Sequence, residues 1–476
     1  MTSATTPPAP ADAPPADRIG RIETHGIDVI PDAERHGRAR ELFTVWAAPN
    51  TSFLALVVGT AVVLMGLNLW QALAVIVIGN LFSIVMGIVA VTGPASGTPS
   101  EVTMRAMFGI RGNRVSIAVT GWFVCVVYLA LNWAAASLTA FSLAERAGIP
   151  VNTGVKILII LVIAAATLAI SVYGHATIVK LYVPLTIGLA VVFAVFAVFV
   201  LGQAHWDYQP AEPLHGVELW ATASAGVALI ASGPLSYSNS ADFARYLPRT
   251  TSPFAVAGWT ALGSAAPSVL LSTLGALAAT AVDMTDPEAG FESMLPQWFV
   301  PIFLLAVIAA TIANNATTAY SSGLALQSMG VKLRRSRSVM LDGTLGVALT
   351  LYALLVSNFL DSVSNMMQLI VALTGPVMAI YATDIVTRRN RYDGTELSDE
   401  TGRSPFWYHG GVNMAGVIAL VTGVVLAVLS INAPVYTGPI AAAVGGIDLS
   451  LPAGMLSAAI IYVALTRRLY PIAVPA

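Results

Sequence analysis

Two apolar stretches of the chain are interrupted by residues that break a helix and carry polar side chains. The first reads WAAPNTSF (46–53) and the second reads ASGPLSYSNSADF (231–243). Proline removes a helical hydrogen bond, and hydroxyl and amide side chains are costly in lipid unless they are paired. Each interruption can therefore present backbone carbonyls and neutral polar groups to a cation or a polar ligand. A single interruption could equally be a proline kink that neighbouring hydroxyls satisfy.

A third apolar stretch, AATIANNATTAYSSG (309–323), carries polar residues at spacings of three and four. This spacing places them on one face of a helix. Such a stripe can join helices by hydrogen bonds worth about 0.6 kcal/mol each. Two adjacent asparagines in mid-helix favour a binding site over that role. The residues of the stripe are Thr311, Asn314, Asn315, Thr318 and Ser322.

The elements that carry these residues must lie in a membrane. Hydrophobic residues make up 56% of the 476 and charged residues only 10%, and the mean hydropathy is +0.77. A soluble core could not hide that much apolar surface. Runs of about 20 uncharged residues, the length that crosses a bilayer, predict twelve transmembrane helices, at roughly 42–66, 69–92, 115–143, 155–173, 177–201, 218–240, 253–282, 299–327, 338–357, 359–385, 408–431 and 450–466.

The placement of positive charge supports this count. If the N-terminus is cytoplasmic, only Arg146 and Lys156 of the 23 Lys and Arg residues fall outside. That asymmetry is the one expected of a membrane protein. We expect a multi-pass protein of the plasma (inner) membrane with both termini in the cytoplasm. The first 17 residues lack a basic start and an apolar run, so they are expected to be a disordered tail and not a signal peptide.

Several classes of function are disfavoured by what the spans lack. All six histidines lie in the tail, in loops or at a span edge, no span carries a carboxylate near its middle, and there is no GxxxxGK[ST] loop. An embedded enzyme or an ATP-driven pump is therefore not expected. The single cysteine, Cys125, excludes internal disulfides and cysteine-rich metal sites. We expect no cofactor, no nucleic-acid partner and no obligate protein partner, which leaves transport driven by an ion gradient, with a channel or receptor as the competitor.

The two interruptions are five spans apart. A matching pair of broken helices is typical of transporters built from inverted repeats, which bind substrate near the middle of the membrane. The predicted organisation is a largely disordered tail (1–41), a first five-helix repeat (42–201), an inverted second repeat (218–386), two peripheral helices (408–467) and a C-terminal tail (468–476).

Three further motifs carry a resemblance to a known family. They read GPASGTPSEVTMRAMFGIRGN (93–113), SADFARYLPR (240–249) and YATDIVTRRNRYDGTEL (381–397). The chain resembles the nucleobase:cation symporter-1 family, in particular its purine and cytosine permease branch, over nearly its whole length after residue 21. The resemblance implies an all-α, LeuT-like fold with a five-plus-five inverted repeat and two peripheral helices.

The same resemblance implies a secondary active symporter that imports a nucleobase or a related planar heterocycle, coupled to Na+ or H+ by alternating access. Cytosine or a purine is the expected substrate. A hydantoin, allantoin or a pyrimidine precursor of thiamine is the alternative within the family. A substrate-gated channel or a non-transporting sensor is the alternative of another class.

The resemblance also implies substrate-binding residues. Family members stack an aromatic residue of the third span on the substrate ring, and by position Trp122 matches it. Filling of the core or anchoring at the interface are the other roles open to a lone Trp. Many relatives carry Asn or Gln four residues later, where this chain has Val126. Tyr237 is the only ring near the second interruption. The predicted substrate-binding residues are Trp122, Asn50, Ser236, Tyr237, Asn314, Asn315 and Thr318.

The coupling ion has two candidate sites. Sodium-coupled relatives pair carbonyls of the first span with two hydroxyls of the eighth, where this chain has Ala313 and Asn314. The predicted cation-binding residues are Ala47, Ala48, Asn314 and Thr311, with the Asn50 carbonyl beside them. Proton coupling would need a titratable group, and the nearest candidates are Asp242, Asp342 and Asp384 at helix ends. Asp242 could equally be a helix cap or a gate partner of Arg245.

Overall fold

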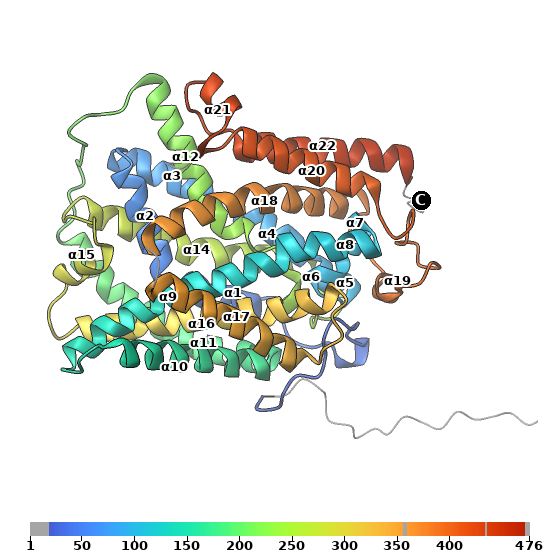
Figure 1. Ribbon diagram of the computed structural model, residues 1–476, viewed down its shortest axis with the longest axis horizontal. Helices are drawn as coiled ribbons and strands as arrows, with labels where there is room; N and C mark the ends of the chain where they lie inside the picture. Colours follow the sequence, from blue (N-terminus) through green and yellow to red (C-terminus); the bar gives the residue numbers. More distant parts are fainter. Residues whose placement is uncertain (1–18, 356–358, 434–435, 472–476) are drawn as a thin grey trace, which may run out of the picture.

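The computed structural model describes residues 19–355, 359–433 and 436–471. Within these ranges the protein is a bundle of long helices, most of which run along its long axis (Figure 1). The first described residues and the C-terminal end lie at the same end of the bundle, which we call the terminal end. The other end, which carries the loops around residues 147–152 and 203–215, is the opposite end.

The first half of the bundle begins with a broken helix. Its elements are α1 (Glu41–Asn50), α2 (Phe53–Leu64), α3 (Leu69–Asn80), α4 (Ser83–Ala90), α5 (Thr92–Ser96), α6 (Ser100–Thr103), α7 (Arg105–Phe108), α8 (Ile110–Ile117), a π-helical segment η2 (Ala118–Phe123), α9 (Val124–Arg146), α10 (Thr153–Tyr173) and α11 (His175–Leu201).

The second half begins with a helix that stops early. Its elements are α12 (Gly216–Leu235), α13 (Ala241–Ala244), α14 (Pro253–Ala279), α15 (Pro287–Ser293), α16 (Val300–Ser328), α17 (Arg335–Leu355) and α18 (Phe359–Thr387). The remaining elements are α19 (Gly394–Ser398), α20 (Met414–Leu429), the short antiparallel pair β1 (Asn432–Ala433) and β2 (Tyr436–Thr437), α21 (Pro439–Ala443) and α22 (Ser450–Leu469).

The described helices confirm an all-α membrane protein. Ten of them are long and apolar enough to cross a membrane, and α1 with α2 makes an eleventh span bent by 59°. Helix α20, at the position of the predicted span 408–431, is apolar but shorter. The twelve predicted spans are consistent with this arrangement. The predicted boundary between the ninth and tenth spans falls on residues 356–358, outside the described residues.

Packing divides the long helices into two groups. In the first, α14 packs on α2, α3 and α4, and α12 packs on α3. In the second, α16 and α17 pack on each other and on α9 and α10. Helix α1 contacts α14, α11 and α16, so it lies between the groups. Helices α20 and α22 pack on each other and on α18, which leaves them at the periphery.

Small residues let α2 and α14 approach closely within the first group. A Cβ added to Gly59 would meet the backbone carbonyl of Ser272, and one added to Gly275 would meet that of Leu56. The Thr60 hydroxyl donates to the Gly275 carbonyl at 3.1 Å. Close packing and interhelical hydrogen bonds are what associate helices in lipid, where the hydrophobic effect gives them no reason to meet.

The N-terminal segment departs from the expectation of a tail that is disordered up to residue 41. Residues 19–40 lie against the terminal end, and Glu23, Ile30 and Arg35 are buried there. The expectation is wrong for these residues because polar contacts, and not an apolar helix face, hold them. Residues 1–18 lie outside the described residues.

Candidate functional site

The first break follows Pro49. Helix α1 ends at Asn50, Thr51 leaves the helical conformation (φ −81°, ψ 62°), and Ser52 is extended and caps α2. The Asn50 amide donates to the Trp46 carbonyl at 2.9 Å, and the Thr51 hydroxyl donates to the Ala47 carbonyl at 2.7 Å. These bonds satisfy carbonyls that the break would otherwise free.

The second break follows Pro234. Helix α12 ends at Leu235, a turn covers residues 236–240, and the four-residue α13 follows. The Ser236 hydroxyl donates to the Gly233 carbonyl at 2.7 Å, which ties down the last turn. Both interruptions in the sequence are therefore true breaks in the helices.

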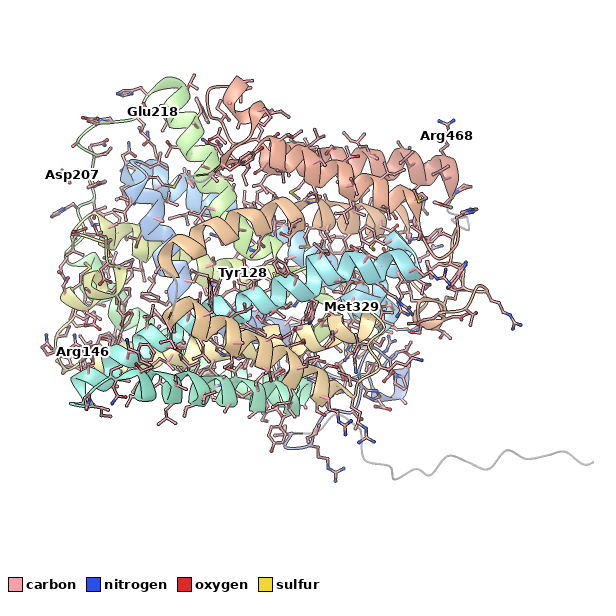
Figure 2. The ribbon with its side chains drawn as sticks, in the orientation of Figure 1. Tyr128, Arg146, Asp207, Glu218, Met329 and Arg468 are labelled. Carbon is pink, nitrogen blue, oxygen red and sulfur yellow. The ribbon has the colours of Figure 1, made fainter. Side chains whose placement is uncertain are left out.

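A cavity of about 80 Å³ lies where the two breaks meet α9 and α16. Tyr128 on α9 lies near the middle of the molecule, whereas Arg146 and Arg468 are at its two ends (Figure 2). The cavity is lined by Trp46, Asn50, Ser52, Leu54, Ala55 and Val58 from the first break, by Val124, Cys125, Tyr128 and Asn132 from α9, by Leu229, Ile230, Gly233, Ser236, Tyr237 and Asn239 from the second break, by Ser268 and Ser272 from α14, and by Asn314, Thr317 and Thr318 from α16.

Three aromatic residues contribute to the wall. Trp46 and Tyr237 meet edge to face, with ring centroids 5.0 Å apart, and Tyr128 comes from α9. Aromatic faces bind a planar ring whatever its hydrogen-bonding edge. The cavity therefore suits a flat ligand.

Amide side chains supply the polar part of the wall. Asn132 donates to Asn314 at 3.4 Å, and Asn314 in turn donates to the Pro49 carbonyl at 2.9 Å. Three buried atoms of the lining residues have no hydrogen-bond partner of normal geometry among the residues that the structure describes: Trp46 Nε1, the Tyr128 hydroxyl and Asn239 Oδ1. Buried polar groups are nearly always paired. These atoms are therefore suited to the donors and acceptors of a ligand.

The lining residues carry no formal charge. An ionised ligand would lose its hydration here without gaining a counter-charge, which is costly. A neutral, planar and polar molecule meets every feature of the wall.

The structure does not bring Trp122 into the cavity. It lies in η2, two residues before Val124, the first lining residue of α9, and its indole N–H donates to an Asp342 carboxylate oxygen at 2.7 Å. Tyr128 and Asn132 occupy the cavity instead. They are an aromatic residue and an amide four residues apart, which is the spacing expected of relatives at Trp122 and Val126. The π-helical segment shifts the helical register at this point, and that shift is hard to read from sequence.

The other predicted substrate-binding residues are divided by the structure. Asn50, Ser236, Tyr237, Asn314 and Thr318 line the cavity. Asn315 does not, because it faces α9, where it donates to the Leu129 carbonyl at 2.9 Å and accepts from Asn132 at 3.0 Å. Asn315 thus fixes the side chain of Asn132 without lining the cavity itself.

Three of the four predicted cation-binding residues, Ala47, Asn314 and Thr311, make hydrogen bonds within the protein. The Ala47 carbonyl accepts from Thr51, and the Thr311 hydroxyl donates to the Val307 carbonyl at 2.8 Å. Ala48 is buried in α1. Asn314 turns its NH2 group, not its oxygen, toward the break in α1. To bind a cation here, Asn314 would have to present its amide oxygen to the break in place of its NH2 group.

One further bond lies at this place and was missed from the sequence. The Tyr182 hydroxyl, from α11, donates to the Ala313 carbonyl at 2.5 Å. Tyr182 is fully buried. A tyrosine in the middle of an apolar run gave no signal of this contact in the sequence.

Asp342 and Asp384 are two of the three acidic residues proposed to carry a proton. Among the described residues, each accepts hydrogen bonds from side chains that hold it in place. Asp342 accepts from Trp122 and from Ser322, and Asp384 accepts from Arg388, Tyr392 and Tyr462.

Asp242 is different, because it faces a second carboxyl group. It accepts from the Ser100 backbone at 3.0 Å and from Ser321 at 2.6 Å. The Glu101 carboxyl also lies within hydrogen-bond contact of it. Burial and the neighbouring Asp242 raise the pKa of Glu101 well above its usual range, and burial raises the pKa of Asp242 against the opposing effect of Arg245. Both shifts favour a proton held between the two carboxyl groups.

The cavity is closed differently toward the two ends. Toward the opposite end it shares Leu54 and Asn132 with a larger hollow of about 550 Å³. Toward the terminal end Phe243 packs on Trp46 and on Tyr320, with ring centroids 5.6 and 5.0 Å apart. The cavity in this structure is thus nearer to opening at the opposite end.

Comparison with known proteins agrees with this geometry. A family model described as "Permease for cytosine/purines, uracil, thiamine, allantoin" matches residues 29–454. YxlA of Bacillus subtilis, provisionally named a purine-cytosine permease, is 29% identical over 460 residues, 94% of this chain and 96% of that protein. The purine-cytosine permease FCY22 of Saccharomyces cerevisiae is 23% identical over 476 residues, 92% of this chain and 85% of that protein.

A solved structure shows the same fold. Mhp1, a nucleobase-cation-symport-1 family transporter in a closed conformation with bromovinylhydantoin bound, superposes with a TM-score of 0.74 at 16% identity, covering 94% of this chain and 95% of that one. The predicted LeuT-like architecture is confirmed.

Proposed function

The chain belongs to the family of permeases for cytosine/purines, uracil, thiamine and allantoin, and we propose that it carries a nucleobase through the cavity between α1, α9, α12 and α16. As a member it is a multi-pass membrane transporter and not an enzyme, and the family is one of cation-coupled symporters of small heterocycles. Cytosine or a purine is the proposed substrate. Its import would follow from exposing the cavity to the opposite end and the terminal end in turn.

The observation that carries this proposal is the wall of the cavity. Aromatic rings of Trp46, Tyr128 and Tyr237 offer stacking, which is worth about 1–3 kcal/mol per base. The unpartnered atoms of Trp46, Tyr128 and Asn239 offer hydrogen bonds, and the absence of formal charge among the lining residues suits a neutral base. The names of YxlA and FCY22 favour purines and cytosine. The bromovinylhydantoin in Mhp1 keeps a hydantoin as the alternative.

We infer that the coupling ion is a proton and not sodium. Thr51, Asn314 and Tyr182 donate to the carbonyls of Ala47, Pro49 and Ala313, so a sodium ion here would have to share these oxygens with hydrogen-bond donors, and Asn314 presents its NH2 group to the break in α1. The Glu101–Asp242 pair supplies a titratable group three residues beyond Asn239, which lines the cavity. Arg245 lies close enough to stabilise the charge that remains when the proton leaves.

The orientation in the membrane is also part of the proposal. The terminal end carries most of the Lys and Arg residues that connect the spans, which the positive-inside rule places in the cytoplasm. The structure would then be nearer to opening outward, and transport would run from outside to inside across the plasma membrane.

Reconstituted protein tests the substrate and the mechanism together. Labelled cytosine or hypoxanthine should exchange against the unlabelled base across the vesicle membrane. An inward proton gradient should concentrate the label, whereas replacing sodium by potassium should change neither binding nor uptake. A channel would equilibrate the label but never concentrate it. Failure to bind any base in a thermal-shift panel, where true ligands stabilise by mass action, would refute the substrate class. Sodium-dependent binding would refute the ion.

A further inference from the structure

A buried carboxylate in the N-terminal segment holds the terminal end together. Glu23 is only 3% exposed. One of its oxygens accepts from the Tyr246 hydroxyl at 2.5 Å, from the Tyr320 hydroxyl at 2.9 Å and from Arg245 at 3.3 Å. Its other oxygen accepts from the His175 backbone N–H at 2.8 Å and lies 3.5 Å from Arg335.

These partners compensate the charge of Glu23. Burial alone would raise its pKa, but Arg335 and Arg245 hold the pKa below its usual range. The carboxylate is therefore ionised at neutral pH. Gly174 precedes helix α11 at a φ of +84°, and a Cβ there would collide with the Glu23 side chain. The carboxylate thus also sits at the positive end of the α11 dipole.

The rest of the segment is fixed on both sides of Glu23. Arg245 donates to the Gly26 carbonyl at 2.6 Å, and the Ile30 N–H donates to the Gly97 carbonyl at 2.9 Å. Arg35 donates to the Pro94 carbonyl at 2.8 Å. Residues 19–35, which we call the strap, contain no α-helix. Side-chain and backbone hydrogen bonds, and not a packed helix, therefore hold the strap.

The strap joins the two helix groups. Arg245 and Tyr246 follow α13, which packs on α4 in the first group. Tyr320 lies on α16 and Arg335 on α17, both in the second group. Arg335 also lies over the Tyr320 ring, 4.4 Å from its centroid. Any movement that separates the groups at this end must break the contacts of Glu23.

The strap lies directly behind the aromatic layer that closes the cavity. Phe243 contacts Trp46 on the cavity wall and Tyr320, whose hydroxyl donates to Glu23. A path from the cavity to the terminal end would have to pass these rings and then the strap.

We propose that the strap is a gate of the transport cycle. Glu23 keeps the terminal end closed while substrate enters the cavity from the opposite end. Release of Glu23 lets the two helix groups part and exposes the cavity to the terminal end. This gate rests on the proposed alternation of access, and it does not depend on which heterocycle is carried.

The chain contains its own reporter for this gate. Cys125 is the single cysteine of the sequence, and it lines the cavity. A membrane-impermeant maleimide can reach it only through whichever end is open. The experiment uses the full chain in vesicles of the two orientations, and it compares wild type with Glu23→Gln. Cys125→Ser measures the background.

Labelling of Cys125 is expected to change in opposite directions at the two ends. Glu23→Gln removes the charge that pairs with two buried arginines and keeps the size of the side chain. Labelling of Cys125 from the terminal end should rise about tenfold or more, and labelling from the opposite end should fall, because the two open states exclude each other. Asp28→Asn is the matched control on the same strap, since the Asp28 side chain is 67% exposed. It should label as wild type does.

Three outcomes would overturn the proposal. Labelling of Glu23→Gln from the terminal end could equal that of wild type, it could rise equally from both ends, which is mere loosening, or it could be matched by Asp28→Asn. If Glu23→Gln does not fold, Tyr320→Phe removes one donor to the same carboxylate and should shift labelling in the same direction by a smaller factor. These readings need no substrate. A failed uptake experiment therefore refutes the proposed function without affecting this test.

Discussion

At the terminal end, the Glu23 carboxylate forms hydrogen bonds or ion pairs with five groups on four different segments of the chain. At the opposite end, Leu54 and Asn132 stand between the cavity and a hollow of about 550 Å³. The hollow is lined by Phe53, Phe141 and other apolar side chains, with an acidic group of Glu145, Asp286, Glu288 and Glu292 at its edge.

The comparison shows that opening the cavity can cost more free energy at one end than at the other. Buried charges are costly when they lose a partner, so a network like that of Glu23 has a large penalty for opening. Apolar contacts and one amide can rearrange side chain by side chain at a smaller cost. In the described structure the opposite end is therefore the easier one to open.

The largest effect is expected from Arg245→Met. Arg245 bonds Glu23, the Gly26 carbonyl and Tyr320 while fully buried. Its loss leaves the Glu23 charge short of a partner, and breaking a buried pair costs about 3–5 kcal/mol. Thermal unfolding of the purified protein should show this loss. Arg249→Met is the control, because Arg249 pairs with Asp32 at an exposed site, where an ion pair is worth about 0–1 kcal/mol. Equal effects of the two changes would contradict the contrast.

A middle-sized effect is expected from Tyr128→Ala. Tyr128 lines the cavity, and loss of a stacked ring costs about 1–3 kcal/mol. Binding of the preferred base should weaken by roughly tenfold to a hundredfold, as titration calorimetry would measure. Trp122→Ala is the comparison, because Trp122 bonds Asp342 outside the cavity. It should bind nearly as wild type does. A larger loss of base binding in the Trp122 variant than in Tyr128→Ala would show that Trp122 is the stacking residue.

The smallest effect concerns the acidic group at the opposite end. Burial, with Glu292 and Asp286 nearby, raises the pKa of Glu288 to about 7. Because the pKa is raised, the stabilising contribution of Glu288 is complete below its ordinary pKa of 4.5 and is lost as the pH rises through about 7. Because maleimide reacts with the thiolate, labelling rises with pH in any variant. The ratio of Cys125 labelling from the opposite end in wild type to that in Glu288→Gln at the same pH should therefore increase a few-fold across that range.

Glu288→Gln should keep only the rise that the thiolate fraction of Cys125 itself causes. Asp283→Asn, at an exposed carboxylate in the preceding loop, is the matched control and should keep the wild-type profile. A ratio of wild type to Glu288→Gln that does not change with pH would show that the opposite end closes without Glu288.

Much of the site was predictable because helix breakers are local signals. Pro49 and Pro234 are each followed by a run of polar residues, and their helices end there, whereas Pro184 and Pro267 lie inside unbroken helices. The five-span offset of the two interruptions predicted that the breaks would meet. Asn50, Ser236, Tyr237, Asn314 and Thr318 followed from proximity to those breaks, and all of them line the cavity.

The prediction and the structure differ where the direction of a side chain depends on the helical register over several turns. The π-helical segment rotates α9 so that Tyr128 and Asn132 replace Trp122 and Val126 at the cavity. Asn315 lies one position from Asn314 and hence about 100° round the helix. It faces α9, not the ligand.

The sequence by itself determined the membrane, the family and the two breaks, because hydropathy, long motifs and proline act through local chemistry. Only the tertiary structure decided how the carbonyls at the breaks are used and how the ends are closed. Tyr182 and Ala313 are 131 residues apart, and Glu23 and Tyr320 are 297 apart. No spacing in the sequence indicates such pairs, because folding brings them together through the packing of helices that lie between them.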